Sequence, residues 1–461
     1  MASIAEGVAP SPVDPAPAGA EAFPPPAQAW YTVGVLAVIT TFALLDQNIL
    51  GLLIQQIKTD FQLSDSQAGL LLGPTQALFY ALVAVPFSRY IDRWTRKWIM
   101  AGGLIVWSLA TAATGLAQSF TQLFVARVAV GAGEAFNGPT AYSITADLFP
   151  RERLPRAVSA LQVGSVAGSG LSLLLGGAII WLVARVGSPE LPLVGVLRPW
   201  QVVLIGVGLP GLAISLLLLT IKEPARRNAR PELNRAGFRK TIDYLWLHFA
   251  VFGPRFIGLA LGSLDVGSRQ WGAAFFQRTY GWSPQQYGLI SGVISIVVML
   301  AGLVIGARWD EWFQKRGDVA GAYRVIVYTR LLAMPFAILM PVMPTPELAL
   351  AFNAVGFLTL AMAGPMLNAV MLIVTPNQIR GQVMALYLFI FTVIGQGLGP
   401  VITGATTDFV FTSPDDLRWS IMVLHIAFLP AALAVTWLGW KPYREEVERL
   451  DAEDAAAGRP A

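Results

Sequence analysis

Apolar segments of roughly 20 residues recur along the chain from residue 31 to residue 440. A helix of about 20 apolar residues crosses the hydrocarbon core of a bilayer and satisfies its own backbone hydrogen bonds there. Charged residues make up only 13% of the chain, against about 25% in soluble domains, so they could not cover a water-soluble surface. We therefore expect an all-α membrane protein with twelve transmembrane helices, at 31–54, 67–88, 98–118, 121–146, 157–183, 200–221, 252–276, 286–307, 323–343, 347–374, 382–410 and 419–440.

The distribution of positive charge predicts the orientation of these helices. If the N-terminus is cytoplasmic, the cytoplasmic segments hold 22 of the 32 Lys and Arg residues and the opposite side holds five. Because cytoplasmic loops of membrane proteins are enriched in Lys and Arg, both termini are expected in the cytoplasm. The composition, rich in Ala and Gly, favours a bacterial inner (plasma) membrane.

The longest cytoplasmic connection divides the spans six and six. Residues 1–29 contain seven prolines and nine alanines but no Lys or Arg, a composition typical of a disordered tail. The expected organisation is a cytoplasmic tail (1–29), a six-helix bundle (30–221), an interbundle linker (222–251), a second six-helix bundle (252–440) and a cytoplasmic tail (441–461).

The two halves repeat each other. The charged segment Ser88–Lys97, after the second span, is echoed 218 residues later by Gly306–Arg316 after the eighth. Gly168-Ser-Gly170 in the fifth span is echoed by Gly395-Gln-Gly397 in the eleventh. Such an internal duplication is the usual build of a secondary transporter.

Five charged residues lie well inside the predicted spans: Asp46, Arg127, Glu134, Asp265 and Arg269. A charge at the bilayer centre costs at least roughly 2.5–3.5 kcal/mol, so each is a candidate for function. Arg127 and Glu134 share a helix face but lie about 10 Å apart along the axis, so each is expected to meet another helix or a cavity. The pattern suits a proton relay or a substrate site inside a helical bundle, in which Asp46, Arg127 and Glu134 take part; the alternative is that they only join helices.

Asp265 and Arg269 have the i,i+4 spacing of a helical ion pair. They either form a structural pair or contribute to a substrate cavity, in which Arg269 would bind an anionic head group through a forked hydrogen bond. Asn137 is a further candidate for substrate contact, with helix packing as the alternative.

Several function classes are disfavoured by what the chain lacks. It has no cysteine, two widely spaced histidines and no Gly-x-x-x-x-Gly-Lys-Ser/Thr loop. We therefore expect no cofactor, no metal, no ATP-driven pumping, and no enzyme. The basic residues follow membrane topology rather than a nucleic-acid surface, so the expected partners are a small or lipid-like substrate, protons and membrane lipids. A monomer is expected.

The chain resembles the major facilitator superfamily from about residue 30 to residue 440. The loop containing Asp92, Arg93, Arg96 and Lys97 is similar to that family's Gly-x-x-x-Asp-Arg-x-Gly-Arg-Lys motif, although Ser88 and Thr95 replace its glycines. The resemblance implies the major facilitator fold, and a gating role for Asp92, Arg93 and Arg96, with Asp310 in the second half. A solvated charge cluster is the alternative.

Two other segments extend the resemblance. Arg127-Val-Ala-Val-Gly-Ala-Gly-Glu134-Ala135 is similar to the family's proton-coupling motif Arg-x-x-x-Gly-x-Gly-Glu-Ala. Leu45-Asp46, Leu63–Leu71 and Lys222–Arg226 resemble the Spinster-like branch, whose members are associated with lysolipids and sphingosine phosphate-like amphiphiles. That branch implies Asp46 and Glu134 as proton-linked acids. Here Gln47 stands where many members have arginine.

The sequence thus predicts a proton-coupled secondary transporter that moves an amphiphilic or organic anionic substrate by alternating access. Import of a small hydrophilic carboxylate is an alternative within transport. A membrane sensor without transport activity is an alternative of a different class.

Overall fold

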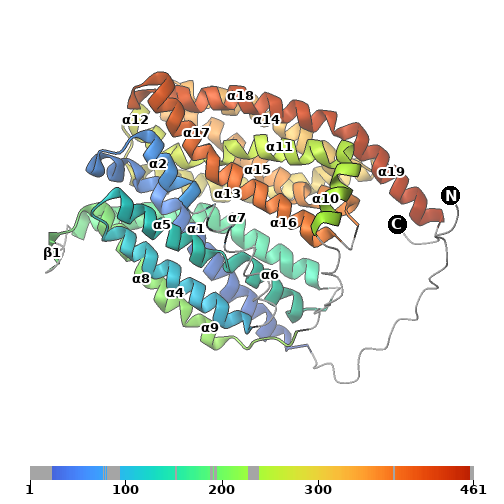
Figure 1. Cartoon of the computed structure of the whole chain (residues 1–461), viewed down its shortest axis with the longest axis horizontal. Helices are drawn as coiled ribbons and strands as arrows, with labels where there is room; N and C mark the ends of the chain where they lie inside the picture. Colours follow the sequence, from blue (N-terminus) through green and yellow to red (C-terminus); the bar gives the residue numbers. More distant parts are fainter. Residues whose placement is uncertain are drawn as a thin grey trace.

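The computed structural model describes residues 23–75, 77, 79, 82, 94–150, 153–186, 190–191, 195–226, 238–376 and 379–456. Within these residues, ten helices are long and apolar enough to cross a membrane. Helices lie roughly side by side in two groups, one above the other (Figure 1). We call the side where α1 begins and α19 ends the termini side, and the opposite side the far side.

The first half contains a helical bundle and one short hairpin. Its elements are α1 (Pro26–Phe61), α2 (Asp65–Leu72), α4 (Arg96–Gly115), α5 (Phe120–Glu134), α6 (Asn137–Leu148), α7 (Leu154–Val186), the antiparallel strands β1 (Glu190–Leu191) and β2 (Gly195–Val196), α8 (Pro199–Ser215) and α9 (Leu217–Thr220).

The second half begins with α10 (Phe238–Leu247), which precedes the bundle. The bundle contains α11 (Phe249–Ser268), the 3₁₀ turn η2 (Arg269–Trp271), α12 (Gly272–Tyr280), α13 (Pro284–Gln314), α14 (Gly321–Leu339), η3 (Met340–Val342), α15 (Pro346–Val374), α16 (Arg380–Ile390), the π-helical η4 (Phe391–Leu398), α17 (Gly399–Thr406), the π-helical η5 (Thr407–Phe411), η6 (Pro414–Asp416), α18 (Leu417–Leu438) and α19 (Trp440–Ala456).

Four helices that start on the far side, α2, α5, α13 and α15, carry side-chain caps. Ser64 begins α2 and Ser283 begins α13, each in a capping box with a glutamine three residues later. Ser119 and Thr345 accept a hydrogen bond from the backbone of α5 and α15. These caps satisfy amide groups that the first helical turn leaves without partners, and so stabilise the four helix starts.

Several predicted spans differ from a single long helix: 200–221 is α8 and α9, 252–276 is α11, η2 and α12, and 382–410 is α16, η4, α17 and η5. The span at 121–146 consists of α5 and α6, separated at Ala135 and Phe136. Pro139 has no amide hydrogen, and its ring crowds the carbonyl four residues earlier, which accounts for the interruption there. The span at 67–88 begins as α2, but most of its later residues lie outside the described part of the chain.

Candidate functional site

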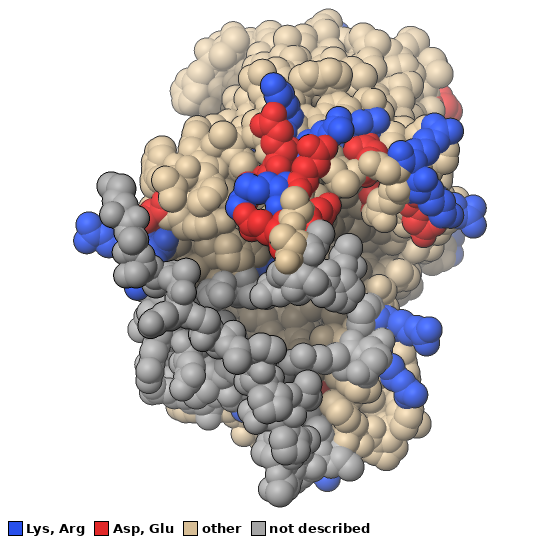
Figure 2. All heavy atoms as spheres, turned by 90° about the vertical axis from the view of Figure 1, so that its right-hand side faces the viewer, with Lys and Arg blue, Asp and Glu red and all other residues tan. Residues whose placement is uncertain are grey.

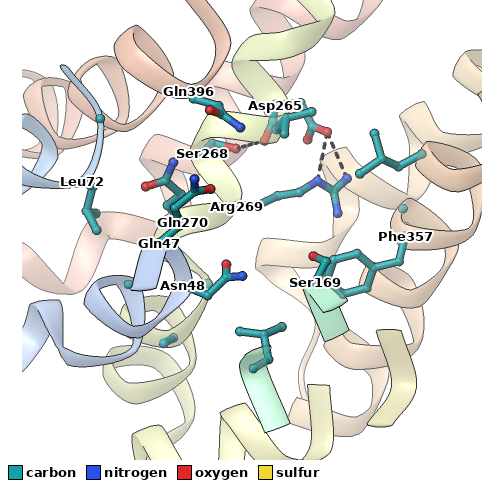
Figure 3. Close-up of a pocket in the computed structure, with 18 of the residues that line it drawn as sticks. Gln47, Asn48, Leu72, Ser169, Asp265, Ser268, Arg269, Gln270, Phe357 and Gln396 are labelled. Carbon is teal, nitrogen blue, oxygen red and sulfur yellow. Dashed lines mark hydrogen bonds and ion pairs between the residues drawn. The ribbon is translucent and has the colours of Figure 1, made fainter. Parts of the chain in front are cut away.

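A cavity of about 730 Å³ lies between the two halves. Its lining combines apolar side chains such as Leu44, Phe275 and Phe389 with a smaller polar set. The polar set is Gln47, Asn48, Glu134, Ser169, Asp265, Ser268, Arg269, Gln270, Tyr287, Asn353, Thr392, Gln396 and His425. Figure 3 shows Asp265 and Arg269 on one wall and Gln47 and Asn48 on another. A molecule with a polar head and an apolar body would find both kinds of contact here.

The first half contributes a sealed acid cluster, which we define as Asp46, Thr111, Arg127 and Glu134. Their exposed fractions are 2% or less. The Thr111 hydroxyl donates to Asp46 at 2.7 Å, and Arg127 Nη1 lies 3.7 Å from the other carboxyl oxygen of Asp46. Glu134 is within hydrogen-bonding reach of Asp46 and also accepts from Gln47 Nε2 at 3.1 Å.

The cluster brings three of the predicted site residues together from two helices. Arg127 and Glu134 each contact a residue of α1, as their spacing along α5 leads one to expect. Glu134 lines the cavity and Asp46 lies directly behind it. Glu134 therefore connects the cavity to the sealed acid.

The second half contributes an open cluster, which we define as Asp265, Arg269, Asn353 and His425. Arg269 donates to Asp265 through Nη2 at 3.0 Å and Nε at 3.2 Å, and to Asn353 Oδ1 at 3.0 Å. His425 Nε2 lies 3.0 Å from the second carboxylate oxygen of Asp265. The side chains of Asp265 and Arg269 are 13% and 20% exposed, and all four residues line the cavity.

Helix irregularities lie at both clusters. The α5–α6 interruption immediately follows Glu134, and the α11 helix changes to a 3₁₀ turn at Arg269. The π-helical η4 carries Gln396 into the cavity. Irregular backbone inside a membrane is tolerated where it is buried in protein or lines a cavity, and it is typical of transporter binding sites.

Other candidates from the sequence lie elsewhere. Asn137 is buried and does not line the cavity, and its Oδ1 has no hydrogen-bond partner among the described residues. Asp92 and Arg93 fall outside the described residues. Arg96 is 1% exposed and binds Asp147 at 2.5 Å and Glu223 at 2.9 Å. These contacts lie within the first half and the start of the linker.

The remaining gating candidate, Asp310, contacts its own helix. It accepts a hydrogen bond from Gln314 at 2.8 Å on the termini side. Among the residues that the structure describes, neither Arg96 nor Asp310 forms a hydrogen bond or ion pair with the opposite half. Figure 2 views this side, where charged side chains, including those of α19, gather over the second half.

An ion-pair network joins the two halves on the far side. We define this far-side latch as Lys58, Asp65, Arg278 and Asp408. Asp65, whose side chain is 0% exposed, pairs with Lys58 at 2.7 Å and with Arg278 of the second half at 2.6 Å. Asp408 accepts the amides of Asp65 at 3.0 Å and of Ser66 at 2.6 Å. The latch closes the far side.

Close helix contacts reinforce this closure. A Cβ atom added to Gly177 of α7 would lie 2.8 Å from the Leu289 amide nitrogen of α13, and one on Gly69 would lie 2.6 Å from the Pro400 carbonyl oxygen. The cavity lining instead includes Ala385 and Leu388 of α16, the helix that begins on the termini side. The conformation is thus closed on the far side.

Comparison with known proteins identifies the family. The model of the Major Facilitator Superfamily matches residues 36–400 and also residues 273–460. An MFS-type efflux pump of Mycolicibacterium smegmatis is 27% identical over 432 residues, which are 92% of this chain and 95% of the pump. Human protein spinster homolog 3 is 26% identical over 474 residues, covering 95% of this chain and 86% of that protein. The predicted similarity to Spinster proteins is confirmed.

Solved structures share the fold. A bacterial homolog of the human lysosomal transporter Spinster, in an inward-facing and unoccupied conformation, has a TM-score of 0.78 and 24% identity over 92% of this chain and 99% of its own. A D-xylose–proton symporter has a TM-score of 0.66 and 15% identity over 88% of this chain and 97% of its own. These likenesses, together with the family match, confirm the predicted all-α major facilitator architecture.

Proposed function

Because this chain belongs to the major facilitator superfamily, we propose that it is a proton-coupled secondary transporter of amphiphilic, lipid-like anions. The family makes the protein a multi-pass membrane transporter and not an enzyme. The observation that carries the finer proposal is a single cavity that joins the sealed acid cluster to Arg269 across a largely apolar lining.

The composition of the sealed acid cluster supports proton coupling. Two carboxyl groups in contact and one guanidinium are electrically neutral together when the pair holds one proton. Loss of that proton would leave a net negative charge in a site almost without water, which is costly. The cluster is therefore suited to hold one proton and to release it when water or another charge reaches Glu134.

The cavity supports an amphiphile rather than a small hydrophilic solute. Arg269 supplies a forked donor for a phosphate or carboxylate, while aliphatic and aromatic side chains cover most of the remaining wall. A small carboxylate would leave that apolar wall in contact with water. We therefore assign the head group to the open cluster and the hydrocarbon tail to the apolar wall.

A flux experiment tests this assignment. The protein would be reconstituted in liposomes with a pH gradient of one unit, and the movement of a radiolabelled lysophosphatidate and of succinate would be compared. We expect gradient-dependent movement of the lysophosphatidate that an ionophore collapses. Movement of succinate alone would favour the small-carboxylate alternative, and binding without flux of either compound would favour a sensor.

The far-side latch supports alternating access, with the termini side facing the cytoplasm as the Lys and Arg distribution indicates. Opening the far side requires the pair between Asp65 and Arg278 to break. A hydrogen bond to a charged group contributes about 1.5–3 kcal/mol, so its loss should shift the equilibrium roughly tenfold or more toward an outward-open state.

The chain lacks cysteine, which allows a direct test of the latch. A single cysteine replacing Ser169 in the cavity would be labelled with a membrane-impermeant maleimide from each side. Asp65→Asn should increase labelling from the far side about tenfold, whereas the exposed Asp415→Asn should not. Equal labelling in both variants would remove the latch from the access cycle.

A further inference from the structure

His425 lies inside a membrane-spanning helix and is bonded on both sides of its ring. It is on α18, is 3% exposed and lines the cavity. Its Nδ1 lies 2.8 Å from the Ala337 carbonyl oxygen of α14. Four residues beyond Ala337 stands Pro341, which has no amide hydrogen to donate to that carbonyl. A carbonyl oxygen only accepts, so Nδ1 carries a hydrogen.

The other ring nitrogen faces two oxygen atoms. His425 Nε2 lies 3.0 Å from Asp265 Oδ1 and 3.3 Å from Ser268 Oγ. The Ser268 hydroxyl has a nearer acceptor, the main-chain oxygen of Asp265 at 2.8 Å. Its single hydrogen is best used there, which leaves Ser268 as an acceptor toward Nε2.

This arrangement requires one more proton than a neutral histidine and an ionised carboxylate supply. With its hydrogen on Nδ1, a neutral imidazole would direct the Nε2 lone pair at oxygen lone pairs of Asp265 and Ser268. The other neutral tautomer would direct the Nδ1 lone pair at the Ala337 carbonyl. We infer that His425 and Asp265 together hold one proton on the Nε2 side of the ring, with Ser268 Oγ as its hydrogen-bond acceptor and Asp265 Oδ1, 3.0 Å away, as its ionic partner. The pair so forms a second proton site, distinct from the sealed acid cluster.

The charges around this proton give it a consequence for substrate binding. Arg269 lies beside Asp265, Tyr287 of α13 and Asn353 of α15 line the same cavity, and Glu134 faces it from the first half. Asp265, Arg269 and His425 carry a net charge of plus one with the proton and zero without it. An anion bound in the cavity therefore stabilises the protonated form of the pair, and by linkage the protonated pair binds the anion more tightly. This consequence rests on the proposed function, whereas the proton site does not.

Nitrogen-15 NMR of labelled histidine tests the proton site without any substrate. The chain has two histidines, and His248→Gln leaves the signal of His425 alone. In the membrane-reconstituted full chain at pH 7.5 we expect either a doubly protonated His425 ring or an infrared carboxylic-acid band that Asp265→Asn removes. A neutral ring with a bare Nε2, together with no such band, would overturn the inference.

A binding measurement tests the linkage separately. The affinity of the protein for oleoyl lysophosphatidate should fall as the pH rises through the titration of the pair, by up to about tenfold per pH unit. His425→Gln should reduce this dependence to less than about twofold per unit while the protein still binds. An unchanged pH dependence would separate the pair from substrate binding. Lack of gradient-driven flux with an intact NMR signature would reject the proposed function but not the proton site.

Discussion

Asp46 and Asp265 occupy equivalent places in the two halves, but their surroundings differ. Asp265 follows Asp46 by 219 positions, close to the 218 that separate the two charged loops. Asn353 follows Arg127 by 226 positions and contacts the same cluster as Asp265. In the first half the cation belongs to α5, whereas in the second half it comes from Arg269, one turn beyond Asp265 on the same chain segment.

This difference shows how two repeated helical bundles can place equivalent acids in different environments. A guanidinium from a neighbouring helix seals Asp46 between helices, with 0% of the residue exposed. A guanidinium that follows the acid along its own helix leaves Asp265 and Arg269 on the cavity wall. We therefore propose that the first half mainly stores the driving proton and that the second half mainly contacts the substrate.

The largest expected effect is that of Asp46→Asn. One coupled proton and a gradient of one pH unit can concentrate a substrate about tenfold. Asp46→Asn should abolish this accumulation in liposomes, while lysophosphatidate binding persists because the open cluster is intact. Asp451→Asn on the exposed face of α19 is the matched control. Full accumulation by the Asp46 variant would reject a driving role for the first half.

The next largest effect is expected for Arg269→Ala. It removes a charged donor worth about 1.5–3 kcal/mol, so lysophosphatidate should bind roughly 10- to 100-fold more weakly in equilibrium titrations. Arg269→Lys should recover part of the loss, because an ammonium keeps the charge but not the planar fork. Wild-type affinity in both variants would place the head group elsewhere.

A smaller change is expected for Thr111→Val. The substitution keeps the shape of the side chain but removes the hydroxyl that donates to Asp46. One such bond stabilises the charged carboxylate by about 1 kcal/mol, so its loss favours the protonated form. The pH midpoint of flux should move upward by less than about one unit. Thr114→Val, whose hydroxyl bonds only to its own helix, serves as the control.

The smallest change is expected for Asp265→Asn, and its sign differs from that of Arg269→Ala. Asp265 competes with a bound anion for Arg269, and a partly exposed ion pair contributes up to about 1 kcal/mol. At neutral pH the variant should therefore bind lysophosphatidate roughly two- to fivefold more tightly. Weaker binding would mean that Asp265 positions Arg269 rather than competing with the substrate.

Much of the fold follows from the sequence because its signals are local. Apolar length identifies the spans, and Ser and Thr before helix starts mark several boundaries on the far side. The interruption after Glu134 was missed, although Pro139 gives a signal for it. The hairpin of β1 and β2 was missed as well, since two-residue strands leave no periodic pattern.

The site was predictable only in part. Charges inside apolar spans identify Asp46, Arg127, Glu134, Asp265 and Arg269, because a buried charge is costly wherever it lies. Their partners come from distant segments, so the contributions of Thr111 and Asn353 require the fold. His425 could have been singled out by the same signal, as an ionisable residue within the predicted span at 419–440. Lys58, Asp65 and Arg278 of the far-side latch lie outside the predicted spans, where charges carry no such signal. Asp408 lies inside the predicted span at 382–410, near its end.

The glycines on the far side have a consequence for the rate of switching. At Gly177 of α7 and at Gly69 of α2, main-chain atoms of the opposite half lie where a side chain would otherwise stand. The two halves can therefore separate here without rearranging interlocked side chains, and the energy barrier to opening the far side is low. A methyl group added at either glycine would push the two halves apart on the far side. We therefore expect a larger fraction of molecules in the conformation that is open on that side.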